Sequence, residues 1–434
     1  MTGTDGVLDD AFLADLDAGL AEADARVGRL YPGDTGTRQP VHTVYVPATR
    51  FHADLVPAWG SAALEILAEH GGGPDGLADA FGVEDLPGLH DRVVGKLDRE
   101  PVEDLRIDFE DGYGAPGDAT EDADALSSAQ ALASTLDRGE APSCVGIRCK
   151  SLDHATRRRG IRTLDLFLVG LLGSADLPDG FVVTLPKVVA IDQVTGFVRV
   201  LRRLEEAHGL PEGRLRFEIQ VETPQSVLAA DGRVALPALV SAAEGRCAGL
   251  HFGTYDYTTA LGVAAAQQSL DHPAADFAKA LMQVAAAGTG VRLSDGSTNL
   301  LPVGDETAVR SGWREHARLV RRSLERAFYQ GWDLHPHQLP SRFVATFAFF
   351  RAGLPATAAR LRGYVERSEG GVLDEPATAE ALAGFLLRGL GCGALDEAEV
   401  ASATTLDRVA IERLARRQPV IMSGLPPPRA ASPT

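Results

Sequence analysis

The segment LRIDFEDGYG, residues 105–114, is a strand-like run that ends in adjacent carboxylates and glycines. Read with the two-residue period of a strand, its side chains fall on two faces, with Leu105, Ile107 and Phe109 on one and Arg106, Asp108 and Glu110 on the other. Clustered carboxylates repel one another unless a cation, a shared proton or a basic partner relieves them. The segment therefore predicts a strand that delivers Glu110 and Asp111 to a charged site.

Composition excludes several classes of protein. With 434 residues, 45% of them apolar, the chain is long and apolar enough to bury a large core. Its formal charge of −18 argues against a surface that binds nucleic acid or anionic lipid, because both need clustered Lys and Arg. No apolar run approaches the roughly 20 residues of a membrane-spanning helix. The 4 cysteines form no CxxC pair, which argues against a zinc finger or a disulfide framework. We expect a cytoplasmic protein.

Short β-rich runs alternate with helical stretches from residue 41 to residue 335. The expected strands are residues 41–47, 105–110, 144–149, 181–186, 215–222, 248–253, 290–294 and 331–335. The expected helices between them are residues 53–69, 120–136, 157–172, 192–208, 236–244, 273–287 and 307–329. This alternation implies right-handed parallel βαβ units, and the full set predicts an α/β fold of the (β/α)8 TIM-barrel class. An open doubly wound sheet is the alternative, although no GxGxxG turn follows the first strand.

The regions outside the barrel predict smaller units. An amphipathic helix at residues 9–30 indicates an N-terminal helical flap, residues 1–40, on a barrel domain at residues 41–340. Helical patterns at residues 342–366, 377–390 and 394–417 predict a C-terminal helical extension, residues 341–423. Residues 424–434 are dense in Pro, Ala and Ser and predict a disordered tail.

Acidic residues follow two of the expected strands in a pattern that fits a metal. In barrels of this class the site lies at the carboxyl ends of the strands. Glu222 ends the fifth expected strand and Asp256 follows the sixth. Hard divalent ions such as Mg²⁺ are usually held by one or two carboxylates, with water and substrate oxygens as the other ligands. The same two acids also fit helix caps or solvated loop residues.

Basic residues follow other expected strands. The guanidinium of Arg148 fits either a substrate carboxylate or a salt bridge to Asp108 or Glu110. A Schiff-base role for Lys187 needs a lowered pKa, which neighbouring acids oppose, so an ion-pairing role is favoured. His335 fits an acid or base, or a structural loop residue.

A basic cluster opens the expected helix at residues 157–172. It consists of Arg157, Arg158 and Arg159 with Arg162. The cluster fits a phosphate contact or a solvated helix start.

Seven short motifs occur in order at the strand ends: YVPA (45–48), DFEDG (108–112), IRC (147–149), LPKV (185–188), VETP (221–224), FGTYD (252–256) and LHPHQ (334–338). Together they resemble the superfamily of citrate lyase β-subunits and HpcH/HpaI aldolases, which includes malyl-CoA lyases. A more distant resemblance is to malate synthase. The likeness covers residues 41–340 and departs at Cys149, where the family has asparagine.

The resemblance implies a Mg²⁺-dependent, or Mn²⁺-dependent, carbon–carbon lyase or aldolase. Its substrate would be a small 2-oxo or 3-hydroxy acid or its CoA thioester, and the reaction would pass through a metal-stabilised enolate. The alternatives are a malate-synthase-like condensing enzyme and a metal-binding, non-catalytic barrel subunit of a larger complex. The family also implies a homo-oligomer, either a trimer or a hexamer.

The resemblance also implies roles for individual residues. Glu222 and Asp256 bind the metal, while Asp111 or Glu110 holds its water molecules. Arg148 contacts the carbonyl or carboxylate of the substrate, and four strand-end residues complete the substrate site: Arg50, Lys187, Gly253 and Thr254. Asp374 lies in a GxxxDxP segment whose acid reaches the site of a neighbouring subunit, although the same residues fit a turn before a helix.

Overall fold

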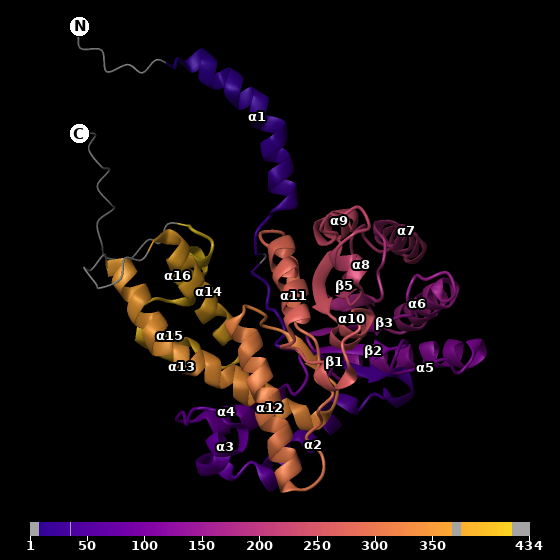
Figure 1. Cartoon of the computed structure of the whole chain (residues 1–434), viewed down its shortest axis with the longest axis vertical. Coiled ribbons are helices and arrows are strands. Elements are labelled where there is room, and N and C mark those ends of the chain that lie inside the picture. Colours follow the sequence, from indigo (N-terminus) through magenta and orange to yellow (C-terminus); the bar gives the residue numbers. More distant parts are fainter. Residues whose placement is uncertain (1–7, 35, 367–374, 419–434) are drawn as a thin grey trace.

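The computed structural model describes residues 8–34, 36–366 and 375–418. Eight parallel strands form a nearly closed barrel in the spatial order β7-β6-β5-β4-β3-β2-β1-β8 (Figure 1). The strands are β1 (His42–Pro47), β2 (Asp104–Asp108), β3 (Cys144–Arg148), β4 (Phe181–Leu185), β5 (Arg216–Val221), β6 (Cys247–Phe252), β7 (Arg292–Ser294) and β8 (Gly331–Asp333). β1 pairs with β8, and a bridge between Ser294 and Gln330 joins β7 to the residue before β8. The predicted (β/α)8 barrel is therefore confirmed, and the open doubly wound sheet is excluded.

Helices surround the barrel and return the chain between parallel strands. They are α2 (Leu55–His70), α3 (Gly73–Phe81), α4 (Leu89–Arg99), α5 (Asp118–Asp137), α6 (Arg157–Leu172), α7 (Ile191–His208), α8 (Pro224–Val227), α9 (Leu236–Ala242), α10 (Thr254–Ala260), α11 (Pro273–Ala286) and α12 (Glu306–Glu325). The sequence analysis did not predict α3 and α4. Each begins after a glycine in the left-handed conformation, Gly72 and Gly88, and such glycines indicate loops when only the sequence is read.

The C-terminal extension consists of α13 (Leu339–Glu366), α14 (Pro376–Cys392), α15 (Glu397–Thr404) and α16 (Arg408–Ala415). The single helix expected at residues 394–417 is wrong. Thr405 has a left-handed backbone with φ 63°, which ends α15, and the side chain of Asp407 then caps α16 by accepting a hydrogen bond from Ala410. The tail expected at residues 424–434 lies outside the described residues.

A buried ion network attaches the extension to the barrel. Asp333 of β8 accepts hydrogen bonds from Arg342 of α13, one of them at 2.9 Å, and lies 2.7 Å from Nδ1 of His42 of β1. Nε2 of His316 of α12 lies 3.2 Å from the same carboxylate. Burial alone would raise the pKa of Asp333, but the charge of Arg342 holds it well below its usual range. The packing of α12 and α13 on β8 thus depends on one ionised carboxylate.

The N-terminal helix α1 (Asp10–Leu30) has the limits that its amphipathic pattern predicts, but none of its residues is buried. In Figure 1, α1 extends away from the rest of the molecule. Its apolar side chains therefore face solvent instead of the barrel.

The interior of the barrel is polar. Arg106 of β2 donates hydrogen bonds to both carboxylate oxygens of Glu218 of β5, at 3.0 and 2.7 Å. Glu218 also accepts hydrogen bonds from Tyr45 and Thr184, and Nε2 of His251 lies 3.1 Å from it. Burial alone would raise the pKa of Glu218, but the charge of Arg106 lowers it to about 2. The charged face that alternation predicts for β2 and β5 therefore lies inside the barrel.

Removing Arg106 should destabilise the fold strongly. We expect Arg106→Met to lower the free energy of unfolding by about 3–5 kcal/mol, because Glu218 is left buried without its counter-charge. Guanidinium chloride unfolding followed by circular dichroism measures this effect. The control is Arg203→Met, because the Arg203 side chain is 77% exposed, and a surface change of this kind should stay within about 0.5 kcal/mol. Equal effects of the two substitutions would contradict the interior network.

Glu218 should also make the free energy of unfolding depend on pH. Because its pKa in the folded protein lies below the ordinary value, its contribution is present above pH 4.5 and is lost as the pH falls towards 2. We therefore expect the free energy of unfolding of Glu218→Gln to fall less steeply between those pH values than that of the wild type. Glu212→Gln is the control, since 79% of the Glu212 side chain is exposed. Parallel curves for all three proteins would be evidence against this assignment.

Candidate active site

Lys187 lies where several strands deliver their terminal residues. It follows β4 with a left-handed backbone, φ 52°, which is uncommon for a residue with a side chain. Its backbone N–H donates a hydrogen bond of 2.7 Å to Oε1 of Glu222. Its ammonium nitrogen lies 2.8 Å from Oε1 of Glu110, 2.8 Å from Oδ2 of Asp111 and 3.3 Å from Oδ2 of Asp256. The residues that follow β2, β5 and β6 therefore meet around one lysine.

The pKa values of Lys187 and of its two acidic neighbours after β2 are shifted in different directions. Burial alone would lower the pKa of Lys187, but the charge of Glu222 and the hydrogen bond to Asp111 raise it well above its ordinary value. Burial raises the pKa of Glu110, whereas the hydrogen bond from Lys187 lowers that of Asp111 against the effect of its own burial. Lys187 therefore remains an ammonium, in agreement with the ion-pairing role favoured from the sequence.

Glu222 is enclosed on several sides. Its side chain is buried, and Oε2 accepts a hydrogen bond from Nε2 of Gln220. A Cβ atom at Gly253 would lie 2.4 Å from Cβ of Glu222 and 2.8 Å from Oε2, so a side chain at position 253 does not fit. Burial raises the pKa of Glu222 to about 8. This carboxyl group is therefore fixed in place and lacks enough positive charge to balance it.

Two hydrogen bonds to Asp108 hold the guanidinium group of Arg148. Nε and Nη2 donate to the two carboxylate oxygens of Asp108 at 2.6 and 2.7 Å, and the guanidinium carbon lies 4.9 Å from the centre of the Tyr45 ring. Nη1 lies 3.3 Å from Oε1 of Gln220 and 3.5 Å from Oε2 of Glu110. Asp108 thus occupies the Nε–Nη2 edge of the guanidinium. Nη1 is the nitrogen that faces Glu110.

The other predicted site residues lie in different surroundings. Thr254 begins α10, is buried, and its hydroxyl lies 3.4 Å from the carbonyl oxygen of Ser297. Arg50 ends the short turn η1 (Ala48–Arg50) after β1, and its exposed side chain makes no ion pair with the described residues. Asp374 lies outside the described residues.

Sequence reasoning underestimated two residues of this site. It treated Asp108 only as one salt-bridge partner for Arg148, and it gave Gln220 no role beside Glu222. The pairing of Asp108 with Arg148 follows from the parallel register of β2 and β3, which neither strand reveals by itself. Gln220 lies two residues before Glu222 on the same face of β5.

The basic cluster at the start of α6 and His335 both have partners within the structure. Arg159 and Arg162 each lie 2.6 Å from the carboxylate of Asp122 on α5, so these members of the basic cluster pair with a neighbouring helix. Nδ1 of His335 accepts a hydrogen bond of 3.2 Å from the backbone of His337, and burial lowers the pKa of His335 to about 4. Both observations fit the structural alternatives.

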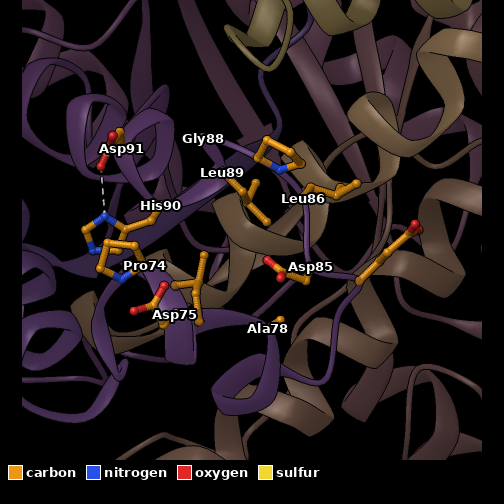
Figure 2. Close-up of a pocket in the computed structure, with 12 residues that line it drawn as sticks. Pro74, Asp75, Ala78, Asp85, Leu86, Gly88, Leu89, His90 and Asp91 are labelled. Carbon is orange, nitrogen blue, oxygen red and sulfur yellow. Dashed lines mark hydrogen bonds and ion pairs between the residues drawn. The ribbon is translucent and has the colours of Figure 1, made fainter.

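A surface hollow lies away from the strand ends, between α3 and α4. Pro74, Asp75, Asp85 and His90 are among its lining residues, and a hydrogen bond joins His90 to Asp91 at 3.0 Å (Figure 2). None of the residues around Lys187 lines it. It provides a source of control residues for the candidate site.

The acids at the strand ends fit a divalent cation of the Mg²⁺ type. Glu222 and Asp256 offer carboxylate oxygens, and such an ion commonly takes its remaining ligands from water and substrate. The described ranges contain no cluster of three or more His, Cys, Asp or Glu side chains placed to hold a metal. The observation that supports the fit is that the buried Glu222 carboxylate accepts hydrogen bonds from two uncharged groups, the backbone N–H of Lys187 and the side-chain amide of Gln220, and makes no ion pair with the described residues.

Residues 20–419 match the model of a family described as Domain of unknown function (DUF6986). The chain belongs to this family. A search among curated proteins finds no match.

Several solved structures are similar to the chain. Haloferax volcanii malate synthase is 16% identical, with 82% of this chain and 86% of that chain covered and a TM-score of 0.48. CitE from Mycobacterium tuberculosis, in complex with magnesium, acetoacetate and coenzyme A, is 18% identical, with 82% and 99% covered and a TM-score of 0.47. An HpcH/HpaI aldolase/citrate lyase family protein from Burkholderia cenocepacia J2315 is 16% identical, with 72% and 92% covered and a TM-score of 0.37. These structures come from the protein groups that the sequence motifs resemble.

The structure also bears on membrane association. Among the helices of the described ranges, none combines the length and the apolar character that a membrane crossing requires.

The contact between Gly253 and Glu222 leads to a direct test. We expect Gly253→Ala to lower the free energy of unfolding by about 1–3 kcal/mol, because the new Cβ displaces the Glu222 side chain. Thermal and denaturant unfolding measure this loss. Gly196→Ala is the matched control: its Cβ meets nothing within 4 Å, and alanine within α7 should stabilise by about 0.5–1 kcal/mol. A Gly253→Ala protein as stable as the wild type would contradict this close packing.

Proposed function

We propose that the chain is a Mg²⁺-dependent carbon–carbon lyase or aldolase that acts on a small 2-oxo or 3-hydroxy acid or on its CoA thioester. The observation that carries the proposal is the meeting of Glu110, Asp111, Glu222 and Asp256 around Lys187 at the carboxyl ends of the strands. The order of the sequence motifs supports the same reaction class. Fold alone would not support it, because barrels of this type host many chemistries.

Glu222 and Asp256 would hold the metal ion, with Mn²⁺ as an alternative to Mg²⁺. When bound, such an ion supplies Lewis-acid polarisation of a substrate oxygen. Glu110 and Asp111 contact the same Lys187 ammonium as Asp256, and would hold water beside the substrate. The fixed position of Glu222 over Gly253 would keep its oxygens in place during the reaction.

Arg148, which is buried, and Arg50, which is exposed, would act on the negative charge of the substrate. Cleavage next to a carbonyl group places charge on its oxygen, and fixed positive groups in a site shielded from water stabilise that charge effectively. Nη1 of Arg148 is available on the side of Glu110, while Asp108 prevents the guanidinium from turning. The exposed Arg50 makes no ion pair with the described residues, so its charge would be free to attract the substrate carboxylate.

The two neighbouring acids after β2 suit different proton-transfer roles. Asp111 is more than half exposed and its pKa is lowered, so it would accept a proton from the substrate. Glu110 is buried and its pKa is raised, so it retains a proton more readily. Two acids with pKa values moved in opposite directions are a common arrangement for acid–base catalysis.

The same side chains serve cleavage and condensation, since both directions share one transition state. A condensing reaction of the malate synthase kind is therefore the second candidate, and the GTYDY sequence at residues 253–257 favours it. A non-catalytic metal-binding subunit is the third. Turnover assays distinguish these candidates.

We expect metal-dependent turnover with at least one substrate of this class. The assay presents 3-hydroxy acids and their CoA thioesters for cleavage, and pyruvate or acyl-CoA with glyoxylate or oxaloacetate for condensation, each with Mg²⁺ and with EDTA. Replacing the proposed ligands, in Glu222→Gln and in Asp256→Asn, should lower kcat by roughly 100-fold or more, as expected when charge stabilisation is lost. Asp85→Asn, in the separate surface hollow, should leave kcat unchanged.

Two outcomes would overturn the proposal. Turnover that is insensitive to EDTA and to both ligand substitutions would remove the metal role. Binding of metal and acid without any turnover would favour the non-catalytic subunit.

A further inference from the structure

Helix α1 carries an apolar seam that no described residue covers. The seam residues follow the alternating three- and four-residue spacing of a coiled-coil helix: Leu13, Leu16, Leu20, Ala23, Val27 and Leu30. The exposed fraction is 47% for Leu20 and 54% for Val27. A helix of 21 residues with glycines at two positions is marginal on its own, because most helical stability in proteins comes from packing. The seam therefore requires a partner surface.

A second unpartnered apolar stripe lies on α11. The outer face of this barrel helix carries Pro273, Phe277, Ala280 and Val284, which again follow a three- and four-residue spacing. The exposed fraction is 56% for Phe277 and 76% for Val284. A helix on the outside of a barrel is expected to present polar residues to solvent. The stripe matches the α1 seam in spacing and chemical character.

We propose that α1 of one copy of this chain packs along α11 of a second copy, and that the reciprocal contact forms about a twofold axis. One symmetric pair then covers both stripes on both copies. The contact does not depend on the chemistry at the ends of the strands.

The geometry favours a second copy over the chain's own α11. The N–H of Gly33 donates a hydrogen bond of 2.8 Å to the carbonyl of Gly288, just beyond the end of α11. From this anchor α1 runs away from the body and from its own α11 (Figure 1). Its 21 residues give it a reach of roughly 31 Å at 1.5 Å per residue. The helix is therefore placed to reach another molecule.

Charge favours α11 over a second α1 helix as the partner. Asp10, Asp17 and Asp24 recur every seventh residue and border one side of the seam. Two antiparallel α1 helices would bring these acidic borders together, which is unfavourable. The acidic border also disfavours an anionic membrane surface.

Basic residues lie beside the α11 stripe, in contrast to the acidic border of α1. Arg322 and Arg326 of the neighbouring chain segment both pair with the carboxylate of Asp276, at 2.6 and 3.0 Å. Lys279 is also within 3.9 Å of this carboxylate. Lys279 is compensated by Asp295, 3.0 Å away, so Arg322 and Arg326 share the single carboxylate of Asp276. Two arginines on one acid leave a local positive surplus beside the residue that precedes Phe277, which suits the acidic border of α1.

Light scattering after size-exclusion chromatography tests the contact with the full chain. We expect wild-type protein to form dimers or assemblies built from them, and Leu16→Glu with Leu20→Glu to halve the mass. Ala18→Glu with Ala25→Glu adds the same charge to the opposite face of α1 and should leave the mass unchanged. Because α1 has no buried residues, both variants should retain the wild-type thermal unfolding of the barrel. A monomeric wild-type protein, or a mass insensitive to the seam variant, would overturn the proposal.

Disulfide trapping identifies the partner helix. Leu20→Cys protein with one tag is mixed with Ala280→Cys protein with another tag under mild oxidation, with each variant alone as a control. A mixed disulfide between the two tags supports the proposal. Trapping only between two Leu20→Cys copies would show α1 pairing with α1. A disulfide within one chain of the double variant at low concentration would show α1 on its own α11, and either result would overturn the proposal.

Discussion

The ammonium group of Lys187 is the interaction on which the candidate site depends. Its side chain is the positive charge among Glu110, Asp111 and Asp256, while its backbone N–H binds Glu222. Without a cation at this point, four acidic side chains from three strands would repel one another in a partly buried space. The left-handed backbone of Lys187 directs both groups to the acids at the same time. The lysine that follows β4 therefore compensates much of the acidic charge gathered at the carboxyl ends of the strands.

The need to pair buried charges also applies deeper inside the barrel, where the charged residues form successive layers. Below the mouth, Asp108 holds Arg148, and further inside Arg106 holds Glu218. Apolar residues on the opposite faces of the strands pack against the helices, so the hydrophobic core surrounds a charged axis. Each charge on this axis is buried and is compensated by a partner from another strand, which makes the axis rigid and intolerant of single substitutions. Glu222, with its pKa raised to about 8, is the clear exception.

The sequence was sufficient for the barrel and for the gathering of acids at its strand ends, but not for the pairing among those residues. Alternation along β2 and β5 identified the polar faces, and the parallel order brought their ends together. The clamp of Asp108 on Arg148 was only one of two alternatives, because it depends on register between strands that are far apart in sequence. α3 and α4 were missed since their bordering glycines resemble loops. The exposure of α1 could not be read from periodicity, which gives the apolar face of a helix but not what covers it.

The most direct test of the central claim is a crystal structure with Mn²⁺ and pyruvate or oxaloacetate, in which anomalous scattering locates the metal. We predict an anomalous peak bound by the carboxylates of Glu222 and Asp256, with the organic acid beside it and Nη1 of Arg148 facing that acid. A peak at another site, or no peak while Lys187 keeps its contacts with the acids at saturating Mn²⁺, would contradict the account.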